Sequence, residues 1–423
     1  MRYRSTRGNE TVSLSDAIAR GLAPDGGLYV PEEMPALGLD AFDGHSDLVD
    51  IATVLLAPFF DGDLLAGELE PICRTAFEFP IPLKHLGDRL SVLELFHGPT
   101  AAFKDVGARF LAQCFCRGLA RGDKTLTILV ATSGDTGGAV AAAFHGMPGI
   151  EVVVLFPEGM VSLRQEKQLT SWGGNVHAFA VAGDFDACQR LAKEAMANSD
   201  LMRDRQLSSA NSINIGRLLP QMAYYAWASL TYVSETGRAP GFIVPTGNLG
   251  NAAAALWAGR VGLPMREVVL ATNANTCIGE FMGGSPWAAQ PTVATLATAM
   301  DVGHPSNGER LLHLYGGEAG MRRELRAYSV SDDDISETIR QGPERWGEVW
   351  DPHTATAVAV RDRLEGDDWI AVATAHPAKF ETVVEPLIGR VIPMPPALQD
   401  VLSRESHVTR IEPRLEVLFA QLG

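Results

Sequence analysis

The sequence lacks the usual features of secreted, disulfide-bonded and membrane-spanning proteins. Its 423 residues include only 5 cysteines, and no two of them form a C-x-x-C pair. This odd, sparse set supports neither a disulfide framework nor a structural zinc site, so we expect a reducing, cytoplasmic location and no metal. The opening residues, MRYRSTRGNETVSLSD, contain no apolar stretch typical of a signal peptide. No run of about 20 apolar residues predicts a membrane span.

Basic residues are also scarce. Lysine and arginine number 35 against 51 aspartates and glutamates, which gives a net charge of −16. A general nucleic-acid surface is therefore not expected, and an anionic ligand would have to be held by local lysines, arginines and helix N-termini. The apolar fraction of 46% is typical of a soluble globular protein, and the length predicts two or three domains.

The pattern of apolar residues changes near residue 90. Before it lie a turn-rich segment, an apolar-patterned helix around 48–60 and a proline-punctuated connection over 77–90. After it, short β-branched runs such as IEVVVLFP alternate with helical stretches, which predicts an α/β fold with parallel sheets flanked by helices. Residues 285–348 are expected to be helical and loop decoration. We expect an N-terminal domain over 1–93 and two α/β regions over 94–210 and 211–423.

Two segments share one pattern: an apolar strand, a glycine-rich loop, then an alanine-rich helix. They are LVATSGDTGGAVAAA (129–143) and IVPTGNLGNAAAA (243–255). A helix start offers unpaired N–H groups, and glycine lets an anion approach the backbone. Neither segment is a P-loop or a GxGxxG fingerprint. Each alone reads equally well as an ordinary turn, but two such loops with hydroxyl and amide side chains favour anion binding.

Lys104 stands after a Gly-Pro turn, in FHGPTAAFKD (96–105). A lysine at such a boundary either faces solvent or is a buried amine that reacts with a carbonyl. Together with two anion-binding loops, it suggests pyridoxal phosphate, whose aldehyde forms an imine with a lysine. Burial would lower the pKa of the amine and favour the neutral base.

Seven segments, in order along the chain, resemble the threonine synthase family. They are YRSTRG, DGGLYVPE, FHGPTAAFKD, ATSGDTGGA, SSANSINIGRLLPQ, PTGNLGN and TAHPAKF. More narrowly, they resemble its bacterial and fungal branch, which has a long N-terminal domain. The resemblance implies the pyridoxal-phosphate fold type II, like the β subunit of tryptophan synthase. It also implies conversion of O-phospho-L-homoserine and water into L-threonine and phosphate, the last step of threonine biosynthesis.

The resemblance also implies roles for individual residues. Lys104 would be the Schiff-base lysine and the acid/base, Thr374 would face the pyridine nitrogen, and Asp135 would contact the ring hydroxyl. The loop that binds the cofactor phosphate would consist of Gly247, Asn248, Leu249, Gly250 and Asn251. The substrate would be bound by Ser133 and Thr136 at its carboxylate and by Ser212, Asn214, Arg217 and Lys379 at its phosphate. The alternative for these last four is a structural cap or a surface residue.

Three other functions stay open at this point. Another pyridoxal-phosphate lyase, such as a serine or threonine dehydratase, would need neither a phosphate-binding Arg/Lys pair nor the N-terminal domain. A relative that only binds phosphorylated ligands would not need Lys104. An NAD-dependent oxidoreductase would need the fingerprint that is missing. The expected partner is a small-molecule substrate, with no nucleic acid or membrane, and the protein would be a monomer or homodimer.

Overall fold

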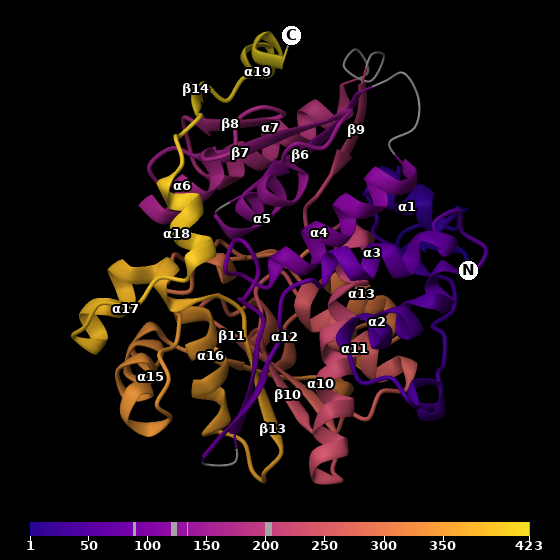
Figure 1. The fold of residues 1–423 in the computed structure, drawn as a ribbon, viewed down its shortest axis with the longest axis vertical. Coiled ribbons are helices and arrows are strands. Elements are labelled where there is room, and N and C mark those ends of the chain that lie inside the picture. Colours follow the sequence, from indigo (N-terminus) through magenta and orange to yellow (C-terminus); the bar gives the residue numbers. More distant parts are fainter. Residues whose placement is uncertain (88–89, 120–124, 133, 199–204, 423) are drawn as a thin grey trace.

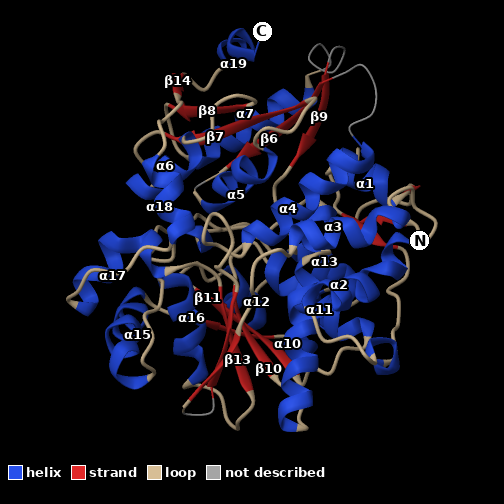
Figure 2. Ribbon diagram, in the orientation of Figure 1, coloured by secondary structure: helices blue, strands red, loops and turns tan. Residues whose placement is uncertain are grey.

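The computed structural model describes residues 1–423 except 88–89, 120–124, 133, 199–204 and 423. The described strands form three sheets, whose strand orders are β2-β1-β3, β12-β11-β10-β13-β5-β4 and β14-β8-β7-β6-β9. In Figure 1 the five-stranded sheet lies above the six-stranded sheet, and the N-terminal elements lie beside them on the right. Figure 2 shows both larger sheets flanked by helices. The predicted α/β class with an additional N-terminal unit is confirmed.

The six-stranded sheet is parallel except for the antiparallel pair β4 and β5. Its strands are β4 (Leu83–Leu86), β5 (Leu90–Glu94), β10 (Gly241–Pro245), β11 (Glu267–Thr272), β12 (Arg326–Ser329) and β13 (Trp369–Ala373). The segment over 77–90 is therefore more than a connection, because it contains β4. Likewise, 285–348 contains the edge strand β12, although only helices and loops are expected there.

The five-stranded sheet is entirely parallel. Its strands are β6 (Thr125–Ala131), β7 (Ile150–Pro157), β8 (Val176–Val181), β9 (Arg205–Ser209) and β14 (Thr409–Ile411). The small N-terminal sheet consists of β1 (Tyr3–Ser5), β2 (Thr11–Val12) and β3 (Tyr29–Pro31). The expected domain boundary after residue 93 falls in β5, which pairs with β13, so the three-part division stays a prediction.

The helices cover both faces of the larger sheets and the N-terminal unit. The N-terminal helices are α1 (Leu14–Arg20), α2 (Leu48–Leu56) and α3 (Leu69–Ala76). The next are α4 (Lys104–Cys114), which continues as a π-helix over Phe115–Leu119, α5 (Asp135–Phe144), α6 (Leu163–Thr170) and α7 (Phe185–Ala197). Then come α9 (Ile215–Leu218), α10 (Gln221–Thr236), α11 (Gly250–Val261), α12 (Cys277–Met282), α13 (Gly308–Leu314) and α14 (Glu318–Glu324). The last are α15 (Asp332–Arg345), α16 (Pro352–Arg361), α17 (Glu381–Ile388), α18 (Pro396–Ser403) and α19 (Leu415–Leu422).

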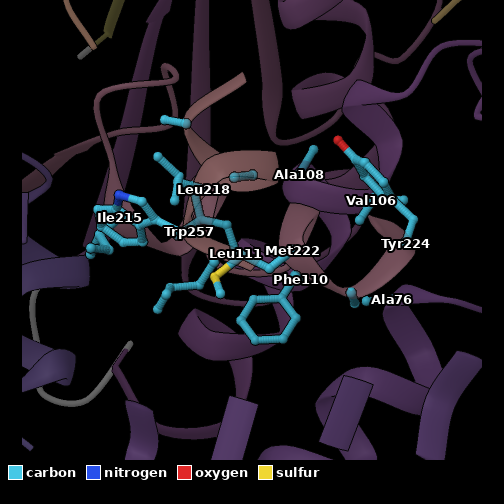
Figure 3. Close-up of a cluster of buried hydrophobic side chains, with 14 of the residues drawn as sticks. Ala76, Val106, Ala108, Phe110, Leu111, Ile215, Leu218, Met222, Tyr224 and Trp257 are labelled. Carbon is cyan, nitrogen blue, oxygen red and sulfur yellow. The ribbon is translucent and has the colours of Figure 1, made fainter. Parts of the chain in front are cut away.

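The main core forms where α4, α9, α10 and α11 meet (Figure 3). Phe110 and Leu111 of α4 pack with Met222 of α10 and Trp257 of α11, and each of these side chains is at most 1% exposed. Fully burying a side chain of this size contributes about 1.5–3 kcal/mol. This core fixes α4 against α9, and α4 begins at Lys104.

One long-range connection places Lys104. The Phe103 N–H donates to the Thr374 carbonyl at 2.8 Å, and Ala102 forms a bridge with Ala375. The start of α4 is therefore joined to the end of β13, about 270 residues later in the chain. In the described part of the chain, no helix is both long and apolar enough to cross a membrane.

Candidate functional site

A cavity of about 420 Å³ lies at the carboxyl ends of three parallel strands. The loops that follow β6, β10 and β13 all line it, as expected for ligand binding by open parallel sheets. Most of the predicted site residues meet here. Those that line the cavity are Lys104, Asp135, Thr136, Ser212, Arg217, Gly247, Asn248, Leu249, Gly250, Asn251 and Thr374.

Lys104 is the first residue of α4 and its side chain is 15% exposed, so the amine reaches the cavity from a mostly buried position. Its Nζ lies 3.8 Å from the Asp135 carboxylate and 5.3 Å from the centre of the Phe103 ring. Burial lowers the pKa of Lys104, and the nearby charges of Lys379 and Arg217 lower it further, while Asp135 opposes them. The site therefore shifts Lys104 toward the neutral amine, the form in which a lysine can act as a nucleophile or a base.

Asp135 lies between two lysines. Lys379 Nζ donates to its Oδ1 at 2.9 Å, and Lys104 Nζ lies 3.8 Å from its Oδ2. Burial opposes ionisation of Asp135, but Lys379 and Lys104 outweigh this and hold its pKa well below the usual range. Asp135 is therefore a fixed negative charge, and it does not exchange protons near neutral pH.

The loop from Gly247 to Asn251 joins β10 to the start of α11. Leu249 has the left-handed conformation, with φ 60°, and a Cβ on Gly247 would lie 2.6 Å from the Cα of Met300. The loop therefore turns tightly against the neighbouring chain and presents the N-terminus of a 12-residue helix to the cavity. Backbone N–H groups and the helix dipole there favour a bound anion.

Two buried donors at the cavity lack hydrogen-bond partners among the described residues. They are Nε of Arg217 and Nδ2 of Asn251, whose side chains are 2% and 4% exposed. The Asn251 amide oxygen accepts from the hydroxyls of Tyr224 and Tyr225, so the amide nitrogen is turned away from both. Burial lowers the pKa of Arg217 to about 10, so it remains charged at neutral pH. Unpaired buried donors of this kind fit an anionic ligand, and specifically a phosphate near Asn251.

Thr374 follows the last residue of β13 and is 5% exposed. Its backbone N–H donates to the Thr354 hydroxyl at 3.2 Å, and that hydroxyl donates in turn to Asp351. Asp351 also binds Nδ1 of His353 at 2.7 Å, and His353 lines the cavity. The residues present fit a ring held between Lys104 and Thr374 with its phosphate at the helix start.

Three predicted site residues are placed differently or not described. Lys379 does not line the cavity, because its Nζ donates to Asp135 and, at 2.7 Å, to the Thr100 carbonyl. Asn214 is fully buried and caps α9 by accepting from the Gly216 N–H. Ser133 lies outside the described residues.

The cavity also has walls that the sequence motifs do not indicate. One wall comes from the start of α7, and a second wall comes from the segment 290–306. His353 joins this second wall to the site, because its Nε2 accepts the Ala299 N–H at 3.1 Å. The only sequence signal for His353 was Asp-Pro-His-Thr at 351–354, which reads as a helix start and carries no sign of a site. These residues were missed because long-range packing brings them to the cavity.

Comparisons with known proteins agree with this geometry. Family models match residues 73–375 (pyridoxal-phosphate dependent enzyme), 2–77 (threonine synthase N terminus) and 354–420 (threonine synthase, C-terminal). A threonine synthase from Serratia marcescens is 42% identical over 92% of this chain and 91% of its own. The crystal structure of threonine synthase from Escherichia coli matches with a TM-score of 0.92 and 38% identity, over 100% and 99% of the two chains. A pyridoxal-phosphate-bound threonine synthase from Brucella melitensis matches with a TM-score of 0.92 and 35% identity, over 100% and 98%.

Proposed function

This chain belongs to the threonine synthase family of pyridoxal-phosphate-dependent lyases, and we propose that it converts O-phospho-L-homoserine and water into L-threonine and phosphate. The observation that carries the proposal is the meeting of Lys104, a helix start open to an anion and the unpartnered Nε of Arg217 in one cavity. A lysine and one anion site would serve any lyase of this cofactor. A second, separate cationic group fits a substrate that itself bears a phosphate.

Residues of this cavity would hold each part of the cofactor. The loop from Gly247 to Asn251 would bind its phosphate, Lys104 its aldehyde carbon, and Thr374 would face the ring nitrogen. When bound, pyridoxal phosphate supplies an electron sink for negative charge that develops on the carbon atoms of the substrate. Asp135 would lie at the ring hydroxyl, where its fixed charge is compensated by Lys379.

Lys104 would carry the proton transfers. Because burial and the neighbouring cations lower its pKa, Nζ can take a proton from the substrate and return it to another carbon. Asp135 keeps Nζ within reach at 3.8 Å without itself gaining the proton, since its own pKa is far below neutral. The enclosed position, with 15% of the side chain exposed, limits proton exchange with water.

Arg217 would bind the substrate phosphate, helped by the Ser212 hydroxyl. Nε of Arg217 is free to donate, and Ser212 accepts from Asn248 Nδ2 at 2.6 Å, so its own hydroxyl proton can point to a ligand. Thr136, with Ser133, would bind the substrate carboxylate. Lys379 and Asn214 would act indirectly, Lys379 by holding Asp135 and Asn214 by fixing the start of α9.

A product assay on purified protein tests this function. With O-phospho-L-homoserine, we expect equal amounts of phosphate and threonine, and the Lys104→Ala variant should lose both products and the visible absorbance of the bound cofactor. Lys193→Ala, which removes an exposed lysine, should behave as wild type. Phosphate released together with a keto acid instead of threonine would contradict the proposal and indicate a different lyase.

The cell compartment and the assembly are further parts of the proposal. We propose a cytoplasmic enzyme that is a monomer or homodimer and is divided into the units 1–93, 94–210 and 211–423. The cysteines support the first point, because all five are unpaired thiols and four of them are buried.

A further inference from the structure

The phosphate loop is tied to the N-terminal unit through one buried arginine. Arg310, on α13, is fully buried and its guanidinium bonds with three separate parts of the chain. Nε donates to the Tyr29 carbonyl of β3 at 3.1 Å, and Nη2 donates to the Ile213 carbonyl at 2.7 Å. Nη1 donates to Oδ1 of Asn307 at 2.6 Å.

Asn307 connects Arg310 to the phosphate loop by hydrogen bonds. Because its Oδ1 accepts from Arg310, its Nδ2 must point the other way, and it donates to the Asn248 carbonyl at 3.0 Å. The Asn248 side chain is fixed as well, since it donates to the Ser212 hydroxyl and accepts from the Ser306 N–H, each at 2.6 Å. A continuous path of hydrogen bonds thus runs from Tyr29 through Arg310 and Asn307 to Asn248.

The orientation of one peptide group shows why this path matters for anion binding. The described chain contains no cis peptide bond, so the N–H of Leu249 points opposite to the Asn248 carbonyl. With the carbonyl bonded to Asn307, that N–H is directed away from Asn307, and Leu249 itself lines the cavity. Leu249 also has a positive φ of 60°, which a residue with a Cβ keeps only when its surroundings enforce it.

The N-terminal unit holds α13 at three points. The first is the hydrogen bond from Arg310 to the Tyr29 carbonyl. At the second, the Arg4 guanidinium donates to Nε2 of His313 at 2.8 Å. At the third, Arg7 and Thr6 both donate to Glu309. Glu309 is thereby engaged by the N-terminal unit, and no ion pair between Arg310 and a carboxylate occurs among the described residues. Burial lowers the pKa of Arg310 to about 9, so its positive charge remains behind the loop at neutral pH.

We propose that Arg310 is a positioning residue that, through Asn307, lets the N-terminal unit hold the loop from Gly247 to Asn251 in its phosphate-binding conformation. The proposal goes beyond the catalytic assignment and depends on the family assignment only for the identity of the phosphate-bearing ligand. It gives the N-terminal unit a function at a cavity that none of the described residues of that unit lines.

The test compares cofactor binding with stability in the apo-protein. Arg310→Gln and Asn307→Ala should each raise the Kd of pyridoxal phosphate about 10- to 100-fold, the size typical of residues that orient ligand-binding groups. The double variant should be no weaker than the worse single one, because both changes break the same path. Hydrogen exchange of the amides over 248–251 should become faster in both single variants.

Arg322→Gln is the matched control. Arg322 also donates to two backbone carbonyls, those of Phe281 and Ser285. Among the described residues, it makes no hydrogen bond to the loop from Gly247 to Asn251. This variant should lower the Tm and leave the Kd unchanged. If Arg310→Gln also lowered only the Tm, or if the two single effects multiplied in the double variant, the proposal would be wrong.

Should Arg310→Gln fail to fold, Asn307→Ala decides the matter, since an unchanged Kd there overturns the proposal. The outcome is independent of the substrate. Wild-type protein that binds the cofactor but makes no threonine would remove the proposed function and leave this inference intact.

Discussion

The loops after β6 and β10 have the same sequence pattern but opposite electrostatic roles. Both follow a buried strand, contain glycine and lead into an alanine-rich helix that starts at the cavity. In the loop after β10, no acidic residue stands in the first turn of α11, so the helix start is free for a ligand. In the loop after β6, Asp135 is itself the first residue of α5. A carboxylate at that position places a fixed negative charge at the positive end of the helix dipole.

The two loops are also held in different ways. The loop after β6 is closed by its own residue Thr132, whose hydroxyl accepts from the N–H groups of Gly134 and Gly137, each at 3.0 Å. The loop after β10 is held from outside, by Asn307 and by the hydroxyl of Ser212. The shared pattern therefore specifies an electropositive helix start. At α5 the loop supplies its own carboxylate, Asp135, whereas the start of α11 has no acidic residue and is held by residues elsewhere in the chain.

Of the changes considered, removing the negative charge of Asp135, in the loop after β6 (the first loop), should have the largest effect on stability. Asp135→Asn leaves the fully buried ammonium of Lys379 without a carboxylate, which should lower the free energy of unfolding by about 3–5 kcal/mol. Urea unfolding of the apo-protein measures this. Glu158→Gln, which breaks an exposed ion pair with Arg410 in the same region, is the control and should have little effect.

The double variant Asp135→Asn with Lys379→Met sharpens this prediction. It removes both buried charges, so part of the lost stability should return. If Asp135→Asn were as stable as Glu158→Gln, Asp135 and Lys379 would not form a charge pair that stabilises the first loop.

Adding a methyl group to the loop after β10 (the second loop) should have an intermediate effect, on the affinity for the cofactor. The Cβ of Gly247→Ala would lie 2.6 Å from the Cα of Met300, and a backbone contact of this kind cannot be relieved by a rotamer change. Overpacking of this type costs about 1–3 kcal/mol, so we expect the Kd of the cofactor to rise about 5- to 150-fold.

Gly138→Ala gives the matched change in the helix that follows the first loop. Its Cβ would lie 3.5 Å from the nearest atom, in Gln168, which is ordinary contact. The Kd should therefore not change, and a helix-interior alanine should slightly raise the Tm. Equal losses of affinity in the two variants would show that the loops do not differ as described.

The smallest expected effect concerns His376, which precedes the turn Pro377–Phe380 that carries Lys379. Burial lowers its pKa from the usual 6.5 to about 4, and its Nδ1 accepts the Ala378 N–H at 3.1 Å. The unfolded chain therefore binds this proton more readily than the folded one. Stability is fully present above pH 6.5 and is lost as the pH falls toward 4.

Because the ring is partly exposed, the loss should be about 1–2 kcal/mol. Urea midpoints across this pH range measure it. His376→Asn keeps a hydrogen-bond acceptor for the turn and cannot titrate. The stability of this variant should therefore fall less steeply than that of wild type as the pH is lowered. If the stability of this variant fell with pH as steeply as that of wild type, His376 would not help to hold Lys379, and hence would not support the loop after β6.

Local sequence determined the central strands and supplied the prediction of the reactive residues. The β-branched runs of β6, β7 and β10 read correctly as buried parallel strands, because both of their faces are covered and no alternation is needed. The edge strands β4 and β12 were not recognised, since their residues are partly or fully exposed and include lysine, histidine and arginine. Lys104 and the glycine-rich loop were identified because a lysine in a distinctive motif and a helix start carry their chemistry locally.

Only the tertiary structure decided the partners of these groups. The pattern alone did not separate Lys379 as a phosphate ligand from Lys379 as the partner of Asp135, because these residues are 244 positions apart. The same holds for Arg310, whose buried bonds join β3, Ser212 and Asn307. The sequence alone predicted which groups could react and where helices begin, since both predictions depend on neighbouring residues. Which charges cancel and which remain for a ligand depended on long-range packing, because electrostatic energy is set by distance in space.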